Sequence, residues 1–138
     1  MRKIKSFEWT ILLFNIIYLI IFTFVFLNRG NQVFLIYIGV VTFFLVFVSW
    51  LHLKYNFSYF VLGGLSAWGL LHMFGGGIII NGEVLYAYWV FPFLRYDMFI
   101  HAFGFCFATL FSYYILKPSL NKDYNKFAIS VFLVLIGM

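Results

Sequence analysis

The residues best suited to chemistry in this chain are Asp97 and His101, which lie four positions apart at the start of a long hydrophobic run. If the run is helical, the two side chains fall one turn apart on the same face. Gly104, Ala108 and Ser112 continue that face, and such small residues favour close packing against another helix. Ionisable residues inside a membrane are costly, usually face the interior of a bundle, and mark functional sites. We therefore expect the pair to point inward.

His72 is the third candidate, because it lies near the end of the preceding apolar run. Three interpretations remain open. In the first, Asp97 and His101 form a structural hydrogen bond between helices, and Asp97 caps the fourth helix. In the second, His72, Asp97 and His101 bind a divalent metal such as Zn, which accepts imidazole and carboxylate ligands. In the third, His101 is a catalytic general acid–base oriented by Asp97, with His72 in the same site.

The composition predicts an integral membrane protein. Hydrophobic residues make up 65% of the 138 residues and charged residues 9%, whereas soluble domains are about 45–50% apolar. The nine Lys and Arg residues outnumber the four Asp and Glu residues, but they are scattered singly between hydrophobic runs, which argues against nucleic acid as a partner. The lipid bilayer is the expected partner. Cys106 is the only cysteine, so no disulfide framework is expected.

Four apolar runs, at about residues 9–27, 33–53, 58–74 and 97–116, are long enough to cross a hydrocarbon core of about 30 Å. Asn15 in the first run is expected to hydrogen-bond to another helix. His52 ends the second run beside Lys54, so we expect an interfacial histidine near the lipid headgroups. The third run is rich in small residues, which predicts a central helix; these are Gly63, Gly64, Ser66, Ala67 and Gly69.

Three consecutive glycines at 75–77 are expected to end the third helix and to give the backbone an unusual path. The connection that follows, residues 78–94, contains an Asn81-Gly82 turn signal. Its aromatic stretch, residues 84–94, is too short to span as a helix. We therefore expect a re-entrant or interfacial element, placed as a lid between His72 and Asp97. The flanking charges Glu83 and Arg95 are interpreted as solvated loop residues, with binding of a lipid headgroup as the alternative.

Charge asymmetry predicts the orientation. With the N-terminus in the cytoplasm, all Lys and Arg residues except Arg29 and Arg95 lie on the cytoplasmic side, as the positive-inside rule requires. The candidate residues then fall in the outer leaflet of the cytoplasmic (inner) membrane. A fifth run begins near Phe127 and ends at Met138, and its roughly 12 residues cover only about 18 Å as a helix. We interpret residues 1–138 as a single transmembrane domain, truncated at the C-terminus, with four full spans and a partial fifth in an all-α bundle.

Two short motifs carry a resemblance. The stretches Leu71-His72-Met73-x-Gly75-Gly76 and Tyr96-Asp97-x-x-x-His101, with the aromatic connector between them, resemble the YjdF-like family of small bacterial inner-membrane proteins. The Asp-x-x-x-His-Ala-Phe portion is similar to a motif of the VanZ-like membrane proteins. Both resemblances imply a multi-helix membrane fold without a settled activity. Members usually continue with a helix bearing Asn-Glu and Glu residues after the stretch that corresponds to residues 129–138.

Two functions follow as hypotheses. The chain is either an enzyme acting on an amphiphile, such as a lipid-linked or envelope precursor, or a non-enzymatic transporter subunit or membrane assembly partner in which the Asp-His pair is structural. The glycines of the third helix and the small strip Gly104, Ala108 and Ser112 of the fourth predict that these two helices pack tightly and antiparallel. This packing should bring the rings of His72 and His101 close enough to share an ion, a water molecule or a substrate group.

Overall fold

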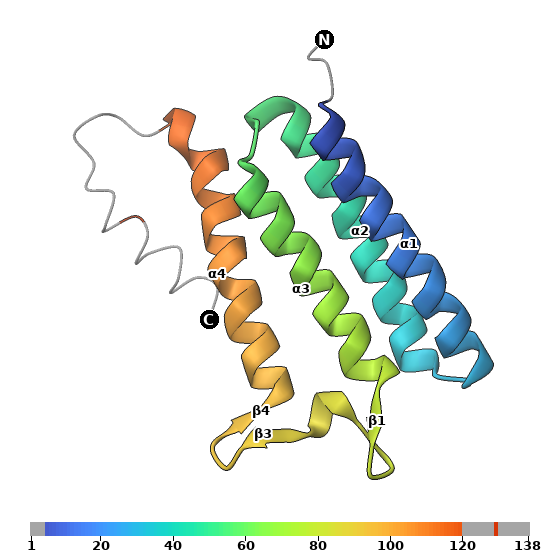
Figure 1. The fold of residues 1–138 in the computed structure, drawn as a ribbon. Coiled ribbons are helices and arrows are strands. Elements are labelled where there is room, and N and C mark those ends of the chain that lie inside the picture. The colour runs from blue at the N-terminus through green and yellow to red at the C-terminus, as the bar shows by residue number, and fades with distance from the viewer. Residues whose placement is uncertain (1–4, 120–128, 130–138) are drawn as a thin grey trace.

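The chain folds into a helical bundle (Figure 1). The computed structural model describes residues 5–119 and residue 129, so the partial fifth span predicted at 127–138 lies, apart from residue 129, outside the described residues. The four long helices, running alternately up and down, are α1 (Ser6–Asn28), α2 (Gln32–Tyr55), α3 (Tyr59–Gly77) and α4 (Tyr96–Leu116). A short 3-10 turn, η2 (Lys117–Ser119), follows α4. The predicted all-α bundle is confirmed at this level.

Polar residues at the helix ends explain where the helices begin. At the start of α1, the Glu8 carboxylate accepts a hydrogen bond of 3.0 Å from the backbone N–H of Lys5. The Asn31 and Ser58 side chains cap α2 and α3, because each accepts a hydrogen bond of 3.3 Å from a backbone N–H in the first turn of its helix. The tight turn between α1 and α2 uses Gly30 at a φ of 61°. The predicted short connection and antiparallel return are therefore confirmed.

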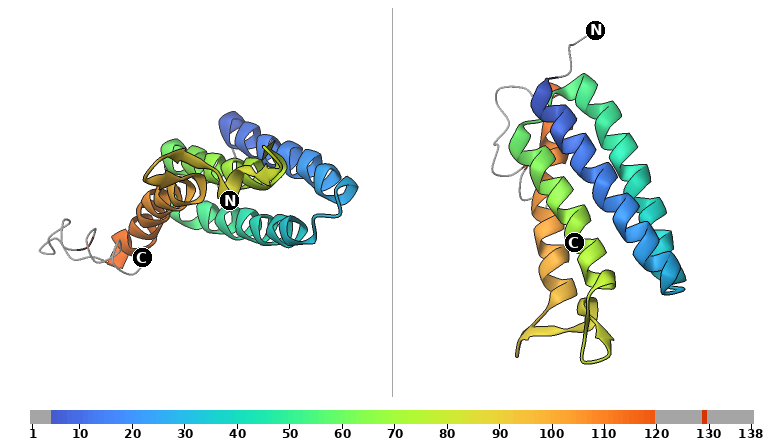
Figure 2. Two further views of the ribbon diagram at one scale, coloured as in Figure 1. Left: turned by 90° about the horizontal axis from the view of Figure 1, so that it is seen from below. Right: turned by 45° about the vertical axis from the view of Figure 1, so that its right-hand side comes forward.

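Helix α3 is the centre of the bundle, as its small residues predicted. It packs against α1, α2 and α4, while α4 lies at one edge of the array and α1 and α2 lie at the other (Figure 2). Close approach is possible because Gly64 and Gly69 leave room for large neighbours, with the Phe107 ring over Gly64 and the Tyr18 hydroxyl over Gly69. The C-terminal end of α3 is also tied to α1, since Arg29 Nη1 donates a hydrogen bond of 2.5 Å to the Gly77 carbonyl.

The inward face of α4 differs from the predicted one. Ile100, Gly104 and Phe107 are its buried residues, whereas Asp97 is half-buried and His101 is exposed. The expectation that the Asp97–His101 pair points into the bundle is therefore wrong. Large rings decide the rotation of the helix, because the Trp68 indole of α3 occupies the space over Gly104 and the Phe107 ring enters the space over Gly64. These contacts turn the polar pair to the edge of the interface.

The three consecutive glycines end α3, which stops at Gly77 as predicted, but the unusual backbone path expected at these glycines is wrong. They form its last turn and are buried, and their φ angles are not positive. Their missing side chains matter for packing, because each glycine lies under an aromatic ring where a methyl group would overlap it. The pairs are Gly75 with Tyr86, Gly76 with Phe34, and Gly77 with Phe22.

The connector between α3 and α4 contains no long helix. It consists of β1 (Ile79–Ile80) and β2 (Glu83–Val84), the 3-10 turn η1 (Leu85–Ala87), and β3 (Trp89–Phe91) and β4 (Leu94–Arg95). Each pair of strands is an antiparallel ribbon. The Asn81-Gly82 turn is confirmed, since φ is 53° at Asn81 and 86° at Gly82, as a two-residue hairpin turn requires. The connector covers the end of the bundle where α3 stops and α4 starts (Figure 1).

Candidate functional site

His72 and His101 meet at the connector end of the bundle. His72 lies on α3, one turn before the buried glycines, and His101 lies in the second turn of α4. Their ring centroids are 5.7 Å apart, so the predicted closeness of the two imidazoles is confirmed. They differ in access, because His72 is only 7% exposed whereas His101 is exposed. The pair therefore joins the interior of the bundle to its surface.

Tyr86 of the connector bridges the two imidazoles. Its hydroxyl lies 2.9 Å from His101 Nε2 and 3.4 Å from His72 Nε2. A hydroxyl has one proton to donate, so one imidazole accepts from Tyr86 while the other donates its Nε2–H to the Tyr86 oxygen. The chain of hydrogen bonds His72–Tyr86–His101 thus has two possible directions, and each direction fixes opposite tautomers on the two histidines.

The local structure explains how Tyr86 reaches this position. It belongs to η1, whose start is held by a 2.8 Å hydrogen bond from the Leu85 N–H to the Ile78 carbonyl at the end of α3. The ring then packs on Gly75 and against Phe34, with ring centroids 6.1 Å apart. Sequence reasoning placed Tyr86 only within the aromatic stretch 84–94, expected to be re-entrant or interfacial, and missed this role. The glycine run was the signal, because a buried helix surface without side chains needs a ring to fill it.

The Tyr86 hydroxyl remains protonated over the physiological range. Burial raises the pKa of Tyr86 to about 12, and the charges of Tyr37 and Asp97 act in the same direction. A neutral phenol can donate and accept a hydrogen bond simultaneously. Tyr86 can therefore link the two histidines in both directions of the hydrogen-bond chain.

Asp97 has a different partner from the one predicted. Arg95 Nε donates a 2.6 Å hydrogen bond to Asp97 Oδ1, and Arg95 Nη2 donates to Oδ2. Asp97 Oδ1 also accepts from the Met98 N–H at 2.8 Å. The N-cap of α4 is Arg95, without a side-chain cap, so the prediction that Asp97 caps this helix is wrong; Asp97 lies in the first turn, where a negative charge is favourable. The hydrogen bonds found for the described residues join Asp97 to Arg95 and Met98 and join His101 to Tyr86, rather than Asp97 to His101. Arg95, whose side chain is 40% exposed, is therefore both a solvated charge and the ion-pair partner of Asp97.

A metal centre made of His72, Asp97 and His101 finds no support in this geometry. Among residues 5–119 and 129, no group of three or more His, Cys, Asp or Glu side chains is arranged to hold a metal ion. The reason is local, because the Asp97 carboxylate is engaged by the Arg95 guanidinium. The two imidazoles approach each other without a carboxylate between them.

A second polar pair lies at the opposite end of the bundle. His52 Nε2 of α2 is 3.3 Å from Glu8 Oε1 of α1, and the two residues are 6% and 8% exposed. The His52 ring is buried near Phe57, with ring centroids 5.8 Å apart, and it lies in the last turn of α2; its position near the lipid headgroups stays a prediction. The apolar periodicity around Glu8 and His52 gave no sign that the two residues are partners, since they come from different helices.

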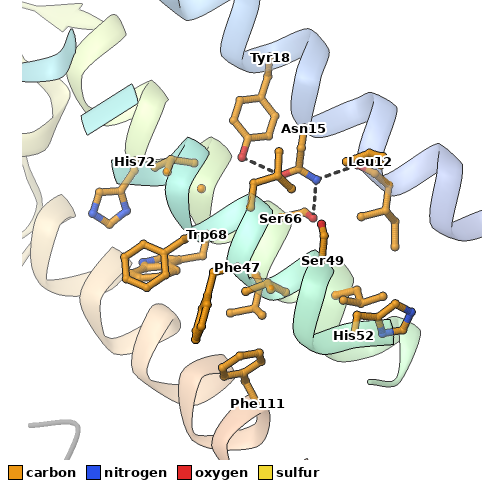
Figure 3. Close-up of a pocket in the computed structure, with 18 of the residues that line it drawn as sticks. Leu12, Asn15, Tyr18, Phe47, Ser49, His52, Ser66, Trp68, His72 and Phe111 are labelled. Carbon is orange, nitrogen blue, oxygen red and sulfur yellow. Dashed lines mark hydrogen bonds between the residues drawn. The ribbon is translucent and has the colours of Figure 1, made fainter. Parts of the chain in front are cut away.

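Between the two ends, a polar triad links α1 to α3. Asn15 Nδ2 donates a 2.7 Å hydrogen bond to Ser66 Oγ, and the Tyr18 hydroxyl donates to Asn15 Oδ1 at 2.8 Å (Figure 3). The predicted helix–helix hydrogen bond of Asn15 is confirmed. All three residues are buried, so the triad satisfies its polar groups internally.

Within the described residues, α1, α2 and α4 are long and apolar enough to cross a membrane. The chain therefore has the characteristics of a helical membrane protein, with a histidine–tyrosine cluster at one end of the bundle and a Glu–His pair at the other. No protein-family model, curated protein or solved structure matches the chain.

Proposed function

We propose that this chain is an enzyme of the cytoplasmic membrane that performs acid–base chemistry on the polar part of an amphiphile. The observation that carries the proposal is the Tyr86 hydroxyl between two imidazoles, 2.9 Å from His101 and 3.4 Å from His72. An imidazole is the side chain best suited to exchange protons near neutral pH. The proposed substrate is a lipid-linked or envelope precursor, whose hydroxyl or phosphate groups would meet the cluster at the connector end of the bundle.

His101 is the residue that meets the substrate, because its ring is exposed while His72 is buried. When His101 Nε2–H donates to Tyr86 and Tyr86 donates to His72, Nδ1 of His101 carries a lone pair and accepts a proton from a substrate hydroxyl or water. The imidazolium formed in this step then donates its Nδ1–H to a leaving oxygen and returns to the neutral form. Tyr86 and the buried His72 thus hold Nε2 of His101, so that Nδ1 serves first as base and then as acid.

Asp97 has an indirect part in this proposal. Its carboxylate binds Arg95 and the Met98 N–H, so it fixes the first turn of α4, from which His101 projects one turn later. Arg95 is also the last residue of β4, the strand with which the connector ends before α4 begins. Asp97 is therefore a positioning residue, and the catalytic contacts belong to His101.

The proposed orientation places the N-terminus in the cytoplasm and the connector on the outer side. Its support is the distribution of basic residues: among those that the structure describes, Arg29 and Arg95 lie at the connector end, whereas Lys5, Lys54 and Lys117 lie at the opposite end (Figure 1). We propose α3 as a fourth span, since its 19 residues cover about 28 Å as a helix. The connector then lies at the outer interface, where exposed aromatic side chains suit the headgroup region; these are Trp89, Phe91 and Phe93, at 53%, 54% and 80% exposed.

The proposal is tested by comparing amphiphiles extracted from cells that express the wild-type chain, His101→Gln or Tyr86→Phe. An amphiphile that accumulates or disappears with the wild type should return to the level of non-expressing cells with His101→Gln. Tyr88→Phe is the matched control, because Tyr88 is 40% exposed on the same connector, and it should behave as wild type. Equal extracts from wild-type and His101→Gln cells would favour the non-enzymatic alternative, a transporter subunit or assembly partner.

A further inference from the structure

A cavity of about 510 Å³ lies between the helices of the bundle. Residues of α1, α2 and α3 form most of its wall, and Ala108 and Phe111 of α4 complete it. Its volume falls in the range of small-molecule sites, about 300–1,000 Å³. In Figure 3, His72 lies at one end of the group of lining residues and His52 lies at the other.

The wall of the cavity is almost entirely apolar. Aliphatic and aromatic side chains from all four helices line it, and its central polar residues, Asn15, Ser66 and Tyr18, hydrogen-bond to one another. At one end, Glu8 and His52 face each other at 3.3 Å. Polar groups that are already paired do not require water in the cavity. The middle of the cavity is therefore suited to hydrocarbon.

The cavity is long enough to hold a lipid chain. Its lining residues on α2 run from Tyr37 to His52, which corresponds to about 22 Å along a helix. One leaflet of a bilayer has a hydrocarbon depth of about 15 Å, half of the roughly 30 Å core. A single extended chain fits this length, whereas a compact apolar ligand would leave part of it empty.

The cavity is continuous with the surface that α2 presents to the bilayer. Val40, Phe44 and Phe47 line it and are also 44%, 46% and 38% exposed on α2. Because α2 is long and apolar enough to cross a membrane, the medium at this surface is lipid. A hydrocarbon chain can therefore enter sideways from the bilayer without passing through water.

We infer that this cavity binds one hydrocarbon chain of a membrane amphiphile, with the polar group of that amphiphile at the His72 end. His72 belongs to the cavity wall and also to the Tyr86–His101 cluster, so a chain in the cavity places its headgroup beside the proposed acid–base residues. At the other end Glu8 and His52 are already paired with each other, so that end has less need of a polar ligand. This inference rests on the proposed function for its substrate and names the substrate class: an amphiphile with a long linear chain.

The test uses Trp68 as a reporter, because its indole lines the cavity. The other three tryptophans, Trp9, Trp50 and Trp89, are replaced by Phe, and they are 55%, 63% and 53% exposed. The protein is placed in vesicles of phosphatidylcholine with or without bromine atoms in the acyl chains, which quench a tryptophan that they touch. We expect bromolipid to quench Trp68 and aqueous iodide to leave it unquenched.

Variants that fill the cavity show whether Trp68 is quenched by lipid bound inside the cavity or by lipid around the protein. Val48→Phe adds a ring to the wall from α2 and should lower bromolipid quenching by about twofold, since it excludes the chain from the cavity. Val33→Phe is the matched control, because Val33 is 61% exposed on the same helix. If Val48→Phe does not fold, Ala108→Leu fills the wall from α4 and Ala102→Leu, at an exposed position, is its control.

Two results would overturn the inference. Equal bromolipid quenching in the filled and control variants would place the quenching lipid outside the cavity, and quenching by iodide would show that the cavity holds water. The measurement does not use catalysis. If the proposed enzyme activity is not found but the cavity-dependent quenching is, the proposed function is wrong and the chain-binding site is still supported.

Discussion

The ring of Tyr86 lies on Gly75, so close that a methyl group on this residue of α3 would overlap it. The contact determines where the Tyr86 hydroxyl sits between His72 and His101. A glycine in the helix and a tyrosine eleven residues later thus act together, and neither is informative without the other. Several measurable effects depend on this contact and on the pairs found along the bundle.

Gly75→Ala should displace Tyr86 and open the histidine cluster. Forcing a methyl group into a packed contact costs about 1–3 kcal/mol, so the melting temperature in detergent should fall. Gly63→Ala is the matched control, since nothing lies within 4 Å of a side chain added there; it should be neutral or stabilise by up to about 1 kcal/mol. A Gly75→Ala protein as stable as Gly63→Ala would show that Tyr86 does not pack on α3 as described.

Tyr86→Phe should keep the ring on Gly75 while removing the bridge between the imidazoles. Nitrogen NMR of histidine-labelled protein should show defined, opposite tautomers for His72 and His101 in the wild type and mixed tautomers in the variant. Tyr86→Phe should lower the free energy of unfolding by about 1–3 kcal/mol, the usual cost of leaving a buried polar group, here the His72 imidazole, without its hydrogen-bond partner. Unchanged histidine spectra in Tyr86→Phe would contradict the hydrogen-bond chain.

Alkaline conditions should weaken the fold through Tyr86. Burial raises its pKa to about 12, whereas the unfolded side chain titrates near 10. Between these values the folded state holds a proton that the unfolded state has lost, so stability is complete below about pH 10 and decreases as the pH rises towards 12. Ultraviolet titration of wild type and Tyr86→Phe gives the difference, and a missing late-titrating tyrosine in the wild type would contradict this burial.

The Asn15–Ser66 hydrogen bond should show measurable coupling between α1 and α3. Interhelical hydrogen bonds in membranes average about 0.6 kcal/mol, with a maximum of about 1.7, so a double-mutant cycle of Asn15→Ala and Ser66→Ala should give a value in this range. Asn15→Ala should be the more damaging single change, because it also removes the acceptor of Tyr18. Coupling near zero in reversible unfolding would show that the 2.7 Å contact adds no stability.

Cysteine labelling tests the orientation. In a background with Cys106→Ser, a membrane-impermeant reagent added to intact cells should label Glu83→Cys on the hairpin and miss Lys54→Cys at the end of α2. The reason is the positive-inside bias, which places the connector outside. Permeabilised cells should label both variants, which controls for exposure. The reverse pattern in intact cells would place the histidine cluster in the cytoplasmic leaflet.

The sequence by itself determined the class and the arrangement of the helices. Hydrophobic length and the polar turns predict the helices, and the small residues of α3 correctly predicted its central position and its closeness to α4 at the His72 and His101 end. Asn15 was also assigned correctly, since a polar residue within an apolar run needs a partner on another helix. These properties depend on local composition and periodicity.

Only the tertiary structure decided which polar groups become partners. Asp97 and His101 share a helical face, but the rings of Trp68 and Phe107 set the rotation of α4, and the two residues bind Arg95 and Tyr86 instead. The rotation depends on the fit of large side chains against glycines of the opposite helix. Such a fit between distant segments has no periodic signature in the chain, so the histidine bridge and the Glu8–His52 pair appear only when the helices are packed.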